Sequence, residues 1–252
     1  MFLQNAWYVA AWETEIGDTP FSRTILNEPV VLYRTDTGKV VALEDRCCHR
    51  ALPLSMGKVV NDRLQCGYHG LEFDGSGACI KVPGQSRIPP GAQVRSYPVI
   101  QRWGWVWIWP GDPAKADDAL LPQWTWLDDP AWKTIPGRGG TPMPVEANYM
   151  LISDNLFDIT HLTYVHASSI GNDSIVEFPV ETERFERGVK MTRLVPDRPP
   201  APFYKKAGSF EGNVDRWLIT TSELPGYIVN DAGTVQDGTG VIPGKVDESV
   251  GV

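Results

Sequence analysis

The chain has 252 residues, of which 42% are hydrophobic and 21% are charged. Such a composition is typical of a globular protein, and the length suffices for two modest domains. The net charge of −8 argues against a surface built for nucleic-acid phosphates or for an anionic membrane. The longest strongly apolar run, residues 103–110, is far too short to span a bilayer. Because a signal peptide and a disulfide framework are both missing from the pattern, we expect a cytoplasmic protein.

The first 110 residues predict antiparallel β structure. Residues 30–33 and 40–43 flank a Thr-Asp-Thr-Gly turn, and residues 71–73 and 78–82 flank Asp-Gly-Ser-Gly. Each of these pairs predicts a hairpin. Between residues 103 and 109, Trp alternates with smaller residues, a period of two that indicates a strand with an aromatic face. We expect these rings to pack in the core rather than to bind a ligand.

The composition changes after this strand. Residues 110–144 are rich in Pro, Gly and Asp, which suits a crossing between domains. Residues 145–165 lack Pro and Gly and have a helical rhythm, and the rest predicts strands joined by loops, most clearly at residues 217–234. We therefore predict three segments: a first domain at 1–112, a connecting segment at 113–144 and a second domain at 145–252.

Residues 46–73 contain three of the four cysteines and two of the four histidines. All but Cys48 form two pairs of one Cys and one His. Cys47-x-His49 and Cys66-x-x-His69 each follow a predicted β segment, with sixteen residues between the pairs. Three interpretations compete. In the first, these cysteines and histidines bind no metal, which is disfavoured because residues of metal-ligand type recur in two tight pairs. In the second, they form a structural Cys₂His₂ zinc site, but such sites usually have a wider spacing than C-x-H. A Rieske [2Fe–2S] cluster, with two Cys on one iron and two His on the other, explains why each loop carries one S and one N donor.

A second group of polar residues lies on the predicted helix. Asp154, Asp158 and His161 are spaced by four and three residues, so they share one helix face. His166 lies about 140° further round an ideal helix than His161, so the helix must end or distort before both imidazoles can reach one ion. Lone histidines are usually structural, but two within six residues beside carboxylates disfavour that interpretation. Two His and one carboxylate on one face of Fe(II) form the facial triad, which leaves positions open for O₂ and substrate.

Four longer motifs add a resemblance to a known family. They are NAWYVAAW, PLSMGKV, CGYHGLEFDG and WIWPGDPAKAD. Over nearly its whole length the chain resembles the oxygenase component of Rieske non-haem iron oxygenases, most closely the vanillate and dicamba O-demethylase branch. The family commonly has Pro where this chain has Cys48, which leaves the ligand spacing intact. The resemblance implies an α+β fold, in which an antiparallel β Rieske domain precedes a helix-grip-type catalytic domain.

The resemblance also implies roles for individual residues. The family pattern N-x-x-D-x-x-H-x-x-x-x-H matches Asn155, Asp158, His161 and His166. The two histidines are then ligands of a mononuclear Fe(II), and Asn155 supports them from nearby. Asp158 is the electron bridge. In a head-to-tail homotrimer it hydrogen-bonds its own His161 and His69 of the next subunit.

The third iron ligand of the family is a carboxylate from a late helix, a position that lies beyond Val252. Carboxylates in the second half of the chain occur in segments that do not read as that helix, so we nominate none of them: Glu211, Asp215, Glu223, Asp231 and Asp237. We therefore expect the C-terminal part of the catalytic domain to be absent from the chain. Residues 227–230 are a candidate strand for lining the substrate pocket.

The implied function is that of a terminal oxygenase supplied with electrons by a separate NAD(P)H-dependent reductase of ferredoxin type. It would use O₂ to monooxygenate or O-demethylate an aromatic acid such as vanillate. One alternative is another hydroxylation, either ring dihydroxylation or methyl hydroxylation of the toluenesulfonate type. A second alternative is a Rieske electron carrier without its own catalysis. The motif of His161 and His166 disfavours it. A zinc-binding structural module is a third.

Overall fold

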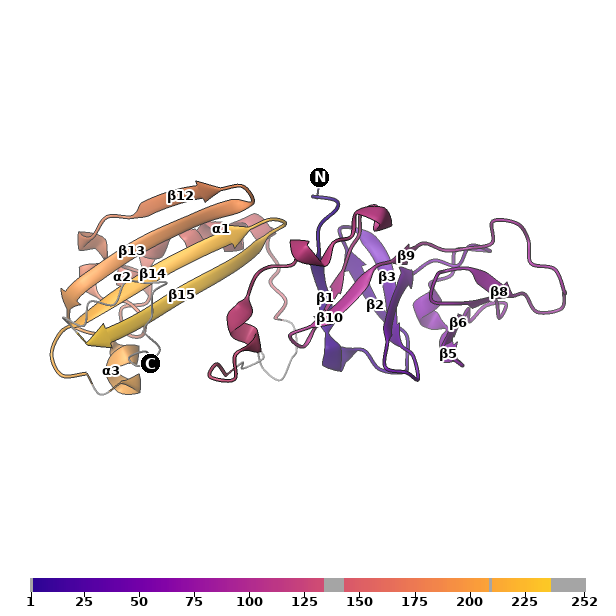
Figure 1. Ribbon diagram of the computed structural model, residues 1–252, viewed down its shortest axis with the longest axis horizontal. Coiled ribbons are helices and arrows are strands. Elements are labelled where there is room, and N and C mark those ends of the chain that lie inside the picture. The colour runs from indigo at the N-terminus through magenta and orange to yellow at the C-terminus, as the bar shows by residue number, and fades with distance from the viewer. Residues whose placement is uncertain (1, 134–142, 209, 237–252) are drawn as a thin grey trace. The chain divides into compact units, whose positions relative to one another are not determined.

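A computed structural model describes residues 2–133, 143–208 and 210–236. The chain forms two compact units, residues 1–144 and 145–252 (Figure 1). The boundary between them lies at the end of the Pro- and Gly-rich stretch that the composition predicts as a crossing. Among the helices of these described residues, none is long and apolar enough to cross a membrane.

The described residues of the first unit form three antiparallel sheets. The first sheet has the order β1 (Tyr8–Trp12), β11 (Trp105–Ile108), β10 (Val99–Arg102). The second has the order β2 (Phe21–Ile25), β3 (Glu28–Arg34), β4 (Val40–Glu44), β9 (Ser96–Tyr97). The third has the order β5 (Lys58–Val60), β6 (Arg63–Gln65), β7 (Glu72–Phe73), β8 (Cys79–Lys81). Both predicted hairpins are confirmed, as the pairs β3–β4 and β7–β8.

The Trp-rich strand is shorter than its sequence pattern suggests. It begins at Trp105, because Trp103 (φ 59°) and Gly104 (φ 75°) form a two-residue turn between β10 and β11. Left-handed backbone at both positions matches the right-handed twist of a hairpin. Trp107 is fully buried, and its ring centroid lies 6.0 Å from that of Trp124. The prediction that these rings pack in the core is confirmed for Trp107 and Trp109, whereas Trp103 and Trp105 are only half-buried.

In the second unit, the residues that the structure describes form one sheet with helices on one face (Figure 1). Its strands are β12 (Glu181–Phe185), β13 (Gly188–Arg198), β14 (Val214–Glu223) and β15 (Tyr227–Gln236), paired in that order. The strand pair predicted within residues 217–234 is confirmed as β14 and β15. Ile159 and Leu162 from the helical segment pack against Met191 of β13 and Leu218 of β14. Each such buried side chain contributes about 1.5–3 kcal/mol, so this contact fixes the helical segment on the sheet.

The prediction of one helix over residues 145–165 is wrong. The structure has α1 (Tyr149–Phe157), a 3₁₀ turn (Ile159–His161) and α2 (Leu162–Val165). A third helix, α3 (Pro202–Ala207), follows β13. Because the first helix ends before Asp158, the carboxylates of residues 154 and 158 do not lie on one continuous helix.

Asp158 is the residue that interrupts the helix. Its backbone leaves the helical region (φ −83°, ψ 76°), while its N–H still donates to the Asp154 carbonyl over 3.0 Å. Its Oδ1 accepts a hydrogen bond of 3.1 Å from the N–H of Thr160. Asp side chains favour helix ends because they can satisfy free N–H groups of the next turn in this way. Asp158 thus ends one helix and begins the turn that carries His161.

Candidate functional site

The first candidate site begins with a loop that follows β4. The Cys47 N–H donates to the Leu52 carbonyl over 2.9 Å, and the Ala51 N–H donates to the Cys47 carbonyl over 2.9 Å. Ala51 has a left-handed backbone with φ 58°. Cys47 is only 3% exposed, whereas His49 is exposed. The loop therefore keeps its thiol inside and its imidazole at the surface.

A second loop, after β6, repeats this arrangement. The Cys66 N–H donates to the Leu71 carbonyl over 2.8 Å, and the Gly70 N–H donates to the Cys66 carbonyl over 3.1 Å. Gly70 is left-handed with φ 72°. Cys66 is 3% exposed and His69 is exposed. The two loops share one backbone pattern, although the imidazole follows its cysteine by two residues in the first loop and by three in the second.

The four predicted cluster residues come together in the structure. The rings of His49 and His69 lie 4.6 Å apart between centroids, and the Cys66 thiol lies close enough to the Cys47 thiol to raise its pKa. Burial raises the pKa of Cys47 to about 11, a main-chain donor at His49 opposes this, and the Cys66 thiol adds to the rise. Thiols in such a place are deprotonated by a bound metal. Paired thiols beside paired imidazoles fit the donor set of a Rieske cluster.

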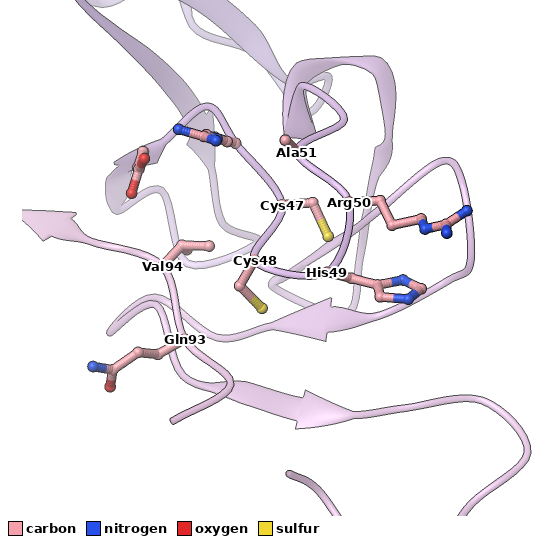
Figure 2. Close-up of a pocket in the computed structure, with 9 residues that line it drawn as sticks. Cys47, Cys48, His49, Arg50, Ala51, Gln93 and Val94 are labelled. Atoms are coloured by element: carbon pink, nitrogen blue, oxygen red, sulfur yellow. The ribbon is translucent and has the colours of Figure 1, made fainter. Parts of the chain in front are cut away.

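Cys48 lies beside these donors and lines a pocket with His49 and His69. It is exposed, and Figure 2 shows it beside Gln93, whose main chain is a hydrogen-bond partner of its thiol. Burial nevertheless raises the pKa of Cys48. The fourth cysteine, Cys79, is buried in the hydrophobic core of the unit, and its thiol donates to the Lys81 carbonyl over 3.5 Å. Of the adjacent cysteines, Cys47 is the one placed against Cys66.

Asp45 is a structural residue of this site that the sequence pattern did not single out. It is 5% exposed and immediately precedes the first loop. Its carboxylate accepts hydrogen bonds from the Ser55 N–H (2.7 Å), the Ser55 hydroxyl (2.6 Å) and the Ser22 hydroxyl (2.9 Å). These bonds tie the start of the loop to segments on both sides of it. An Asp directly before a ligand loop is a weak signal, because most such residues are solvated.

The second candidate site lies where α2 ends. His166 follows the last residue of α2, and its N–H donates to the Leu162 carbonyl over 3.2 Å. Its own carbonyl accepts from the N–H groups of Ser169 (3.0 Å) and Gly171 (2.9 Å). The ring centroids of His161 and His166 are 5.2 Å apart. The ending of the helix at residue 165 thus brings together two rings that a continuous helix would hold about 140° apart.

The main chain also orients His161. Its Nδ1 is hydrogen-bonded to the Asp158 carbonyl. This contact favours the tautomer that leaves Nε2 free as a metal ligand. The family resemblance implies that the carboxylate of Asp158 makes this contact. In the structure the carboxylate is exposed and caps the following turn instead.

Both histidines line a cavity of about 200 Å³ between the helices and the sheet. Asn155 lines it too, and from the predicted pocket strand Asn230 does so. Asp231 also lines the cavity, but its Oδ1 accepts a 2.8 Å hydrogen bond from the indole N–H of Trp217. Within the part of the chain that the structure describes, no group of three or more His, Cys, Asp or Glu side chains could hold one metal ion.

Comparisons with known proteins match each of the two units to a family. The Rieske [2Fe–2S] domain family matches residues 6–98, and the vanillate O-demethylase oxygenase C-terminal domain family matches residues 145–249. The toluene-4-sulfonate monooxygenase iron-sulfur subunit of Comamonas testosteroni is 45% identical, over 99% of this chain and 72% of that protein. The chain belongs to the Rieske non-haem iron oxygenases. The vanillate O-demethylase oxygenase subunit of Pseudomonas sp. (strain HR199 / DSM 7063) is 42% identical, over 95% of the chain and 68% of its own length.

Solved structures of this family carry the same fold. Dicamba monooxygenase bound to dicamba superposes with a TM-score of 0.85 at 36% identity, covering 99% of this chain and 71% of the other. A further structure of dicamba monooxygenase contains non-haem iron and dicamba, and matches with a TM-score of 0.80. The expected fold class, a Rieske β domain followed by a catalytic domain, is confirmed. This Rieske oxygenase is an oxidoreductase of the monooxygenase type, and its cofactors are a [2Fe–2S] cluster and a mononuclear iron.

Proposed function

We propose that the two loops of the first unit hold the [2Fe–2S] cluster through Cys47 with His49 and Cys66 with His69. The support for this assignment is the pairing of buried thiols and exposed imidazoles in two loops of one backbone pattern. A structural zinc site is the weaker interpretation. The family matches favour the cluster, and the C-x-H spacing is tight for the common zinc patterns.

We propose further that His161 and His166 bind the mononuclear Fe(II). The main support is that their rings, 5.2 Å apart, both line the cavity of the second unit. When bound, the two metal groups supply electrons one at a time and activate O₂. The described residues provide the rest: Leu162 and Leu218 give the cavity apolar walls, and Asn155 gives it a polar group.

The reaction we propose is monooxygenation of an aromatic acid, with electrons from a separate NAD(P)H-dependent reductase of ferredoxin type in the cytoplasm. O-demethylation of a methoxylated benzoate such as vanillate is the favoured form. Hydroxylation of an O-methyl carbon gives a hemiacetal, which collapses to a phenol and formaldehyde. Methyl hydroxylation is a second candidate, because the 45% identical relative is named for toluene-4-sulfonate.

Asp158 and Asn155 take part in this function from the helical segment. Asp158 has an exposed carboxylate, and His69 of the cluster site is exposed as well. In a head-to-tail homotrimer this carboxylate would bridge His69 of the next subunit and the iron ligand His161. A carboxylate between two metal-bound imidazoles would orient both rings and couple the two centres.

The test is product analysis with a matched reductase. Formaldehyde should appear with vanillate and NADH, and an alcohol should appear with toluene-4-sulfonate if methyl hydroxylation is the true reaction. His161→Ala serves as the control, because it should keep the cluster spectrum and lose both products. A wild-type protein that binds only cluster iron and forms no product with any methoxylated benzoate would establish an electron carrier instead.

A further inference from the structure

Arg216 is a buried cation in the wall of the catalytic cavity. It lies on β14 and is only 4% exposed, and it lines the same cavity as His161 and His166. Side chains alternate along a strand, so Arg216 shares a sheet face with Leu218. Leu218 packs against Leu162 of α2. Arg216 therefore belongs to the face that carries the iron-site helices.

The guanidinium of Arg216 has few partners. Its Cζ lies 5.0 Å from the ring centroid of Tyr204 in α3. Its Nε and Nη1 are buried without a hydrogen-bond partner among the described residues. Thr234, directly across from Arg216 on β15, is 1% exposed, and its hydroxyl also lacks a partner there. Arg216 thus brings unsatisfied hydrogen-bonding groups into the cavity wall, and Thr234, behind that wall, does not satisfy them.

A buried guanidinium requires a counter-charge. Burial lowers the pKa of Arg216, and Tyr204 opposes that shift. Arg nevertheless stays charged in proteins. Among the described residues that line the cavity, the one carboxylate is that of Asp231, which accepts from Trp217 rather than from Arg216. Leaving a buried charge unpaired is strongly unfavourable, so an anion entering the cavity would be bound here.

We propose that Arg216 binds the acid group of the aromatic substrate and so makes the enzyme selective for anionic arenes. This inference rests on the proposed function, because it assigns a specificity residue to the same cavity. The ligand chemistry is a planar arene that carries a carboxylate or a sulfonate. The ring would lie against the apolar wall, where Leu162 and Leu218 line the cavity with the two histidines.

The test compares three probes with the same ring and methyl ether: 4-methoxybenzoate, 4-methoxybenzenesulfonate and the neutral 4-methoxybenzamide. Dissociation constants are measured by calorimetry on the metal-loaded full chain, without reductase, so that nothing turns over. Arg216→Gln should weaken binding of the preferred anion by about 10- to 100-fold, the usual loss for a charge-assisted hydrogen bond. The amide should bind as before. Arg216→Lys should keep part of the preference, since it retains the charge but not the planar donor geometry.

Arg193 provides a matched control. It is a second buried arginine on the same sheet face, 6% exposed, but it does not line the cavity. Arg193→Gln should leave the ratio of anion to amide affinity unchanged. If Arg216→Gln weakens anion and amide binding equally, or leaves both unchanged, the inference is wrong. Whichever of the two anions loses more affinity in Arg216→Gln identifies the natural acid group.

The same variants separate this inference from the proposed function. If Arg216 governs anion affinity but reductase-driven assays give no formaldehyde, O-demethylation fails and the anion site stands. If Arg216→Gln still binds 4-methoxybenzoate at wild-type affinity and releases formaldehyde from it, the anion site fails and O-demethylation stands.

Discussion

Ala51 and Gly70 occupy the same place in the two cluster loops. Each N–H donates to the carbonyl of the cysteine four residues earlier, and the φ angles are 58° and 72°. For Gly this conformation is free of steric cost, whereas for Ala it costs about 1–2 kcal/mol. The first loop therefore contains backbone strain that the second avoids.

This asymmetry predicts opposite effects for reciprocal substitutions. Ala51→Gly should raise the free energy of unfolding by up to about 1 kcal/mol, because relief of strain exceeds the added chain entropy. Gly70→Ala should lower it by about 1–2 kcal/mol, since the new Cβ would also lie 3.1 Å from Cγ of Pro83. Urea unfolding of the metal-loaded protein measures both. Ala119→Gly is the control, at an exposed alanine without a positive φ. A loss of stability in Ala51→Gly as large as in Ala119→Gly would contradict the strain argument.

Substitutions of the adjacent cysteines Cys47 and Cys48 should have opposite effects on the cluster. Cys47→Ala removes a buried thiol that contacts Cys66, so the reduced protein should lose the Rieske EPR signal. Cys48→Pro and Cys48→Ala should both keep that signal, because the Cys48 thiol is exposed beside Gln93. Loss of the signal in Cys48→Ala with retention in Cys47→Ala would reverse the ligand assignment.

The ligand pairs and the hairpins could be predicted because they are local in the sequence. The two Cys and His spacings identify the first site without knowledge of the fold, and turn residues mark where β3–β4 and β7–β8 reverse. The helix break at Asp158 was less accessible. Helical periodicity continues through it, and the competing side-chain bond to Thr160 becomes visible only in three dimensions.

Arg216 could not be singled out from the sequence. A lone Arg in a strand is usually solvated. Its burial results from the pairing of β13, β14 and β15 and from the helices that cover them. These contacts join different strands and helices, whereas the hydrophobic periodicity of a sequence reflects only residues close together in one element. The burial of Arg216 therefore cannot be predicted from that periodicity.

Glu72 should make the third sheet of the first unit acid-sensitive. Its side chain is 4% exposed and accepts from Lys81 Nζ over 2.6 Å and from Gln65 Nε2 over 3.0 Å. The hydrogen bond from Lys81 lowers the pKa of Glu72 below its ordinary value of 4.5, burial opposes this, and Gln65 reinforces it. Because the folded-state pKa is depressed, the stabilisation is present above pH 4.5 and is lost as the pH falls through the folded value.

Glu72→Gln should therefore cost about 2 kcal/mol at pH 7 and progressively less below pH 4.5, where the wild type loses the same interaction. Unfolding free energies measured from pH 7 down to acid conditions test this. Lys81→Gln should reduce the acid sensitivity as well, because it removes the main cause of the shift. If the free energy of unfolding differs by the same amount between wild type and Glu72→Gln at every pH, Glu72 is not the cause of the acid sensitivity.

Gly171 should be essential for the turn that carries His166. A Cβ at Gly171 would lie 1.8 Å from the Leu162 carbonyl oxygen and 3.1 Å from the His166 carbonyl carbon. Gly171→Ala should therefore displace the turn and reduce mononuclear iron, while the cluster in the other unit keeps its EPR signal. Gly17→Ala is the control, because nothing lies within 4 Å of the Cβ it adds. Iron analysis showing a full mononuclear site in Gly171→Ala would refute the steric argument.

The carboxylate of Asp158 should matter for electron transfer but little for folding. Asn at this position can still accept from the Thr160 N–H, since Asn caps turns as well as Asp does. It cannot supply a charge between two metal-bound imidazoles, and loss of such partners typically costs 10- to 100-fold. Asp158→Asn should thus keep a reducible cluster and bound iron, while product formation in a single turnover falls by about that factor.

Asp154→Asn is the matched control, since Asp154 is exposed on α1 one turn earlier. It should react at the wild-type rate. Size-exclusion chromatography must show the same assembly for both variants, so that a slow reaction cannot be traced to lost subunit contacts. Coupled turnover at the wild-type rate in Asp158→Asn would exclude a bridging role for the carboxylate. The hydrogen bond of His161 to the main-chain carbonyl of residue 158 would then be enough to orient His161 for turnover.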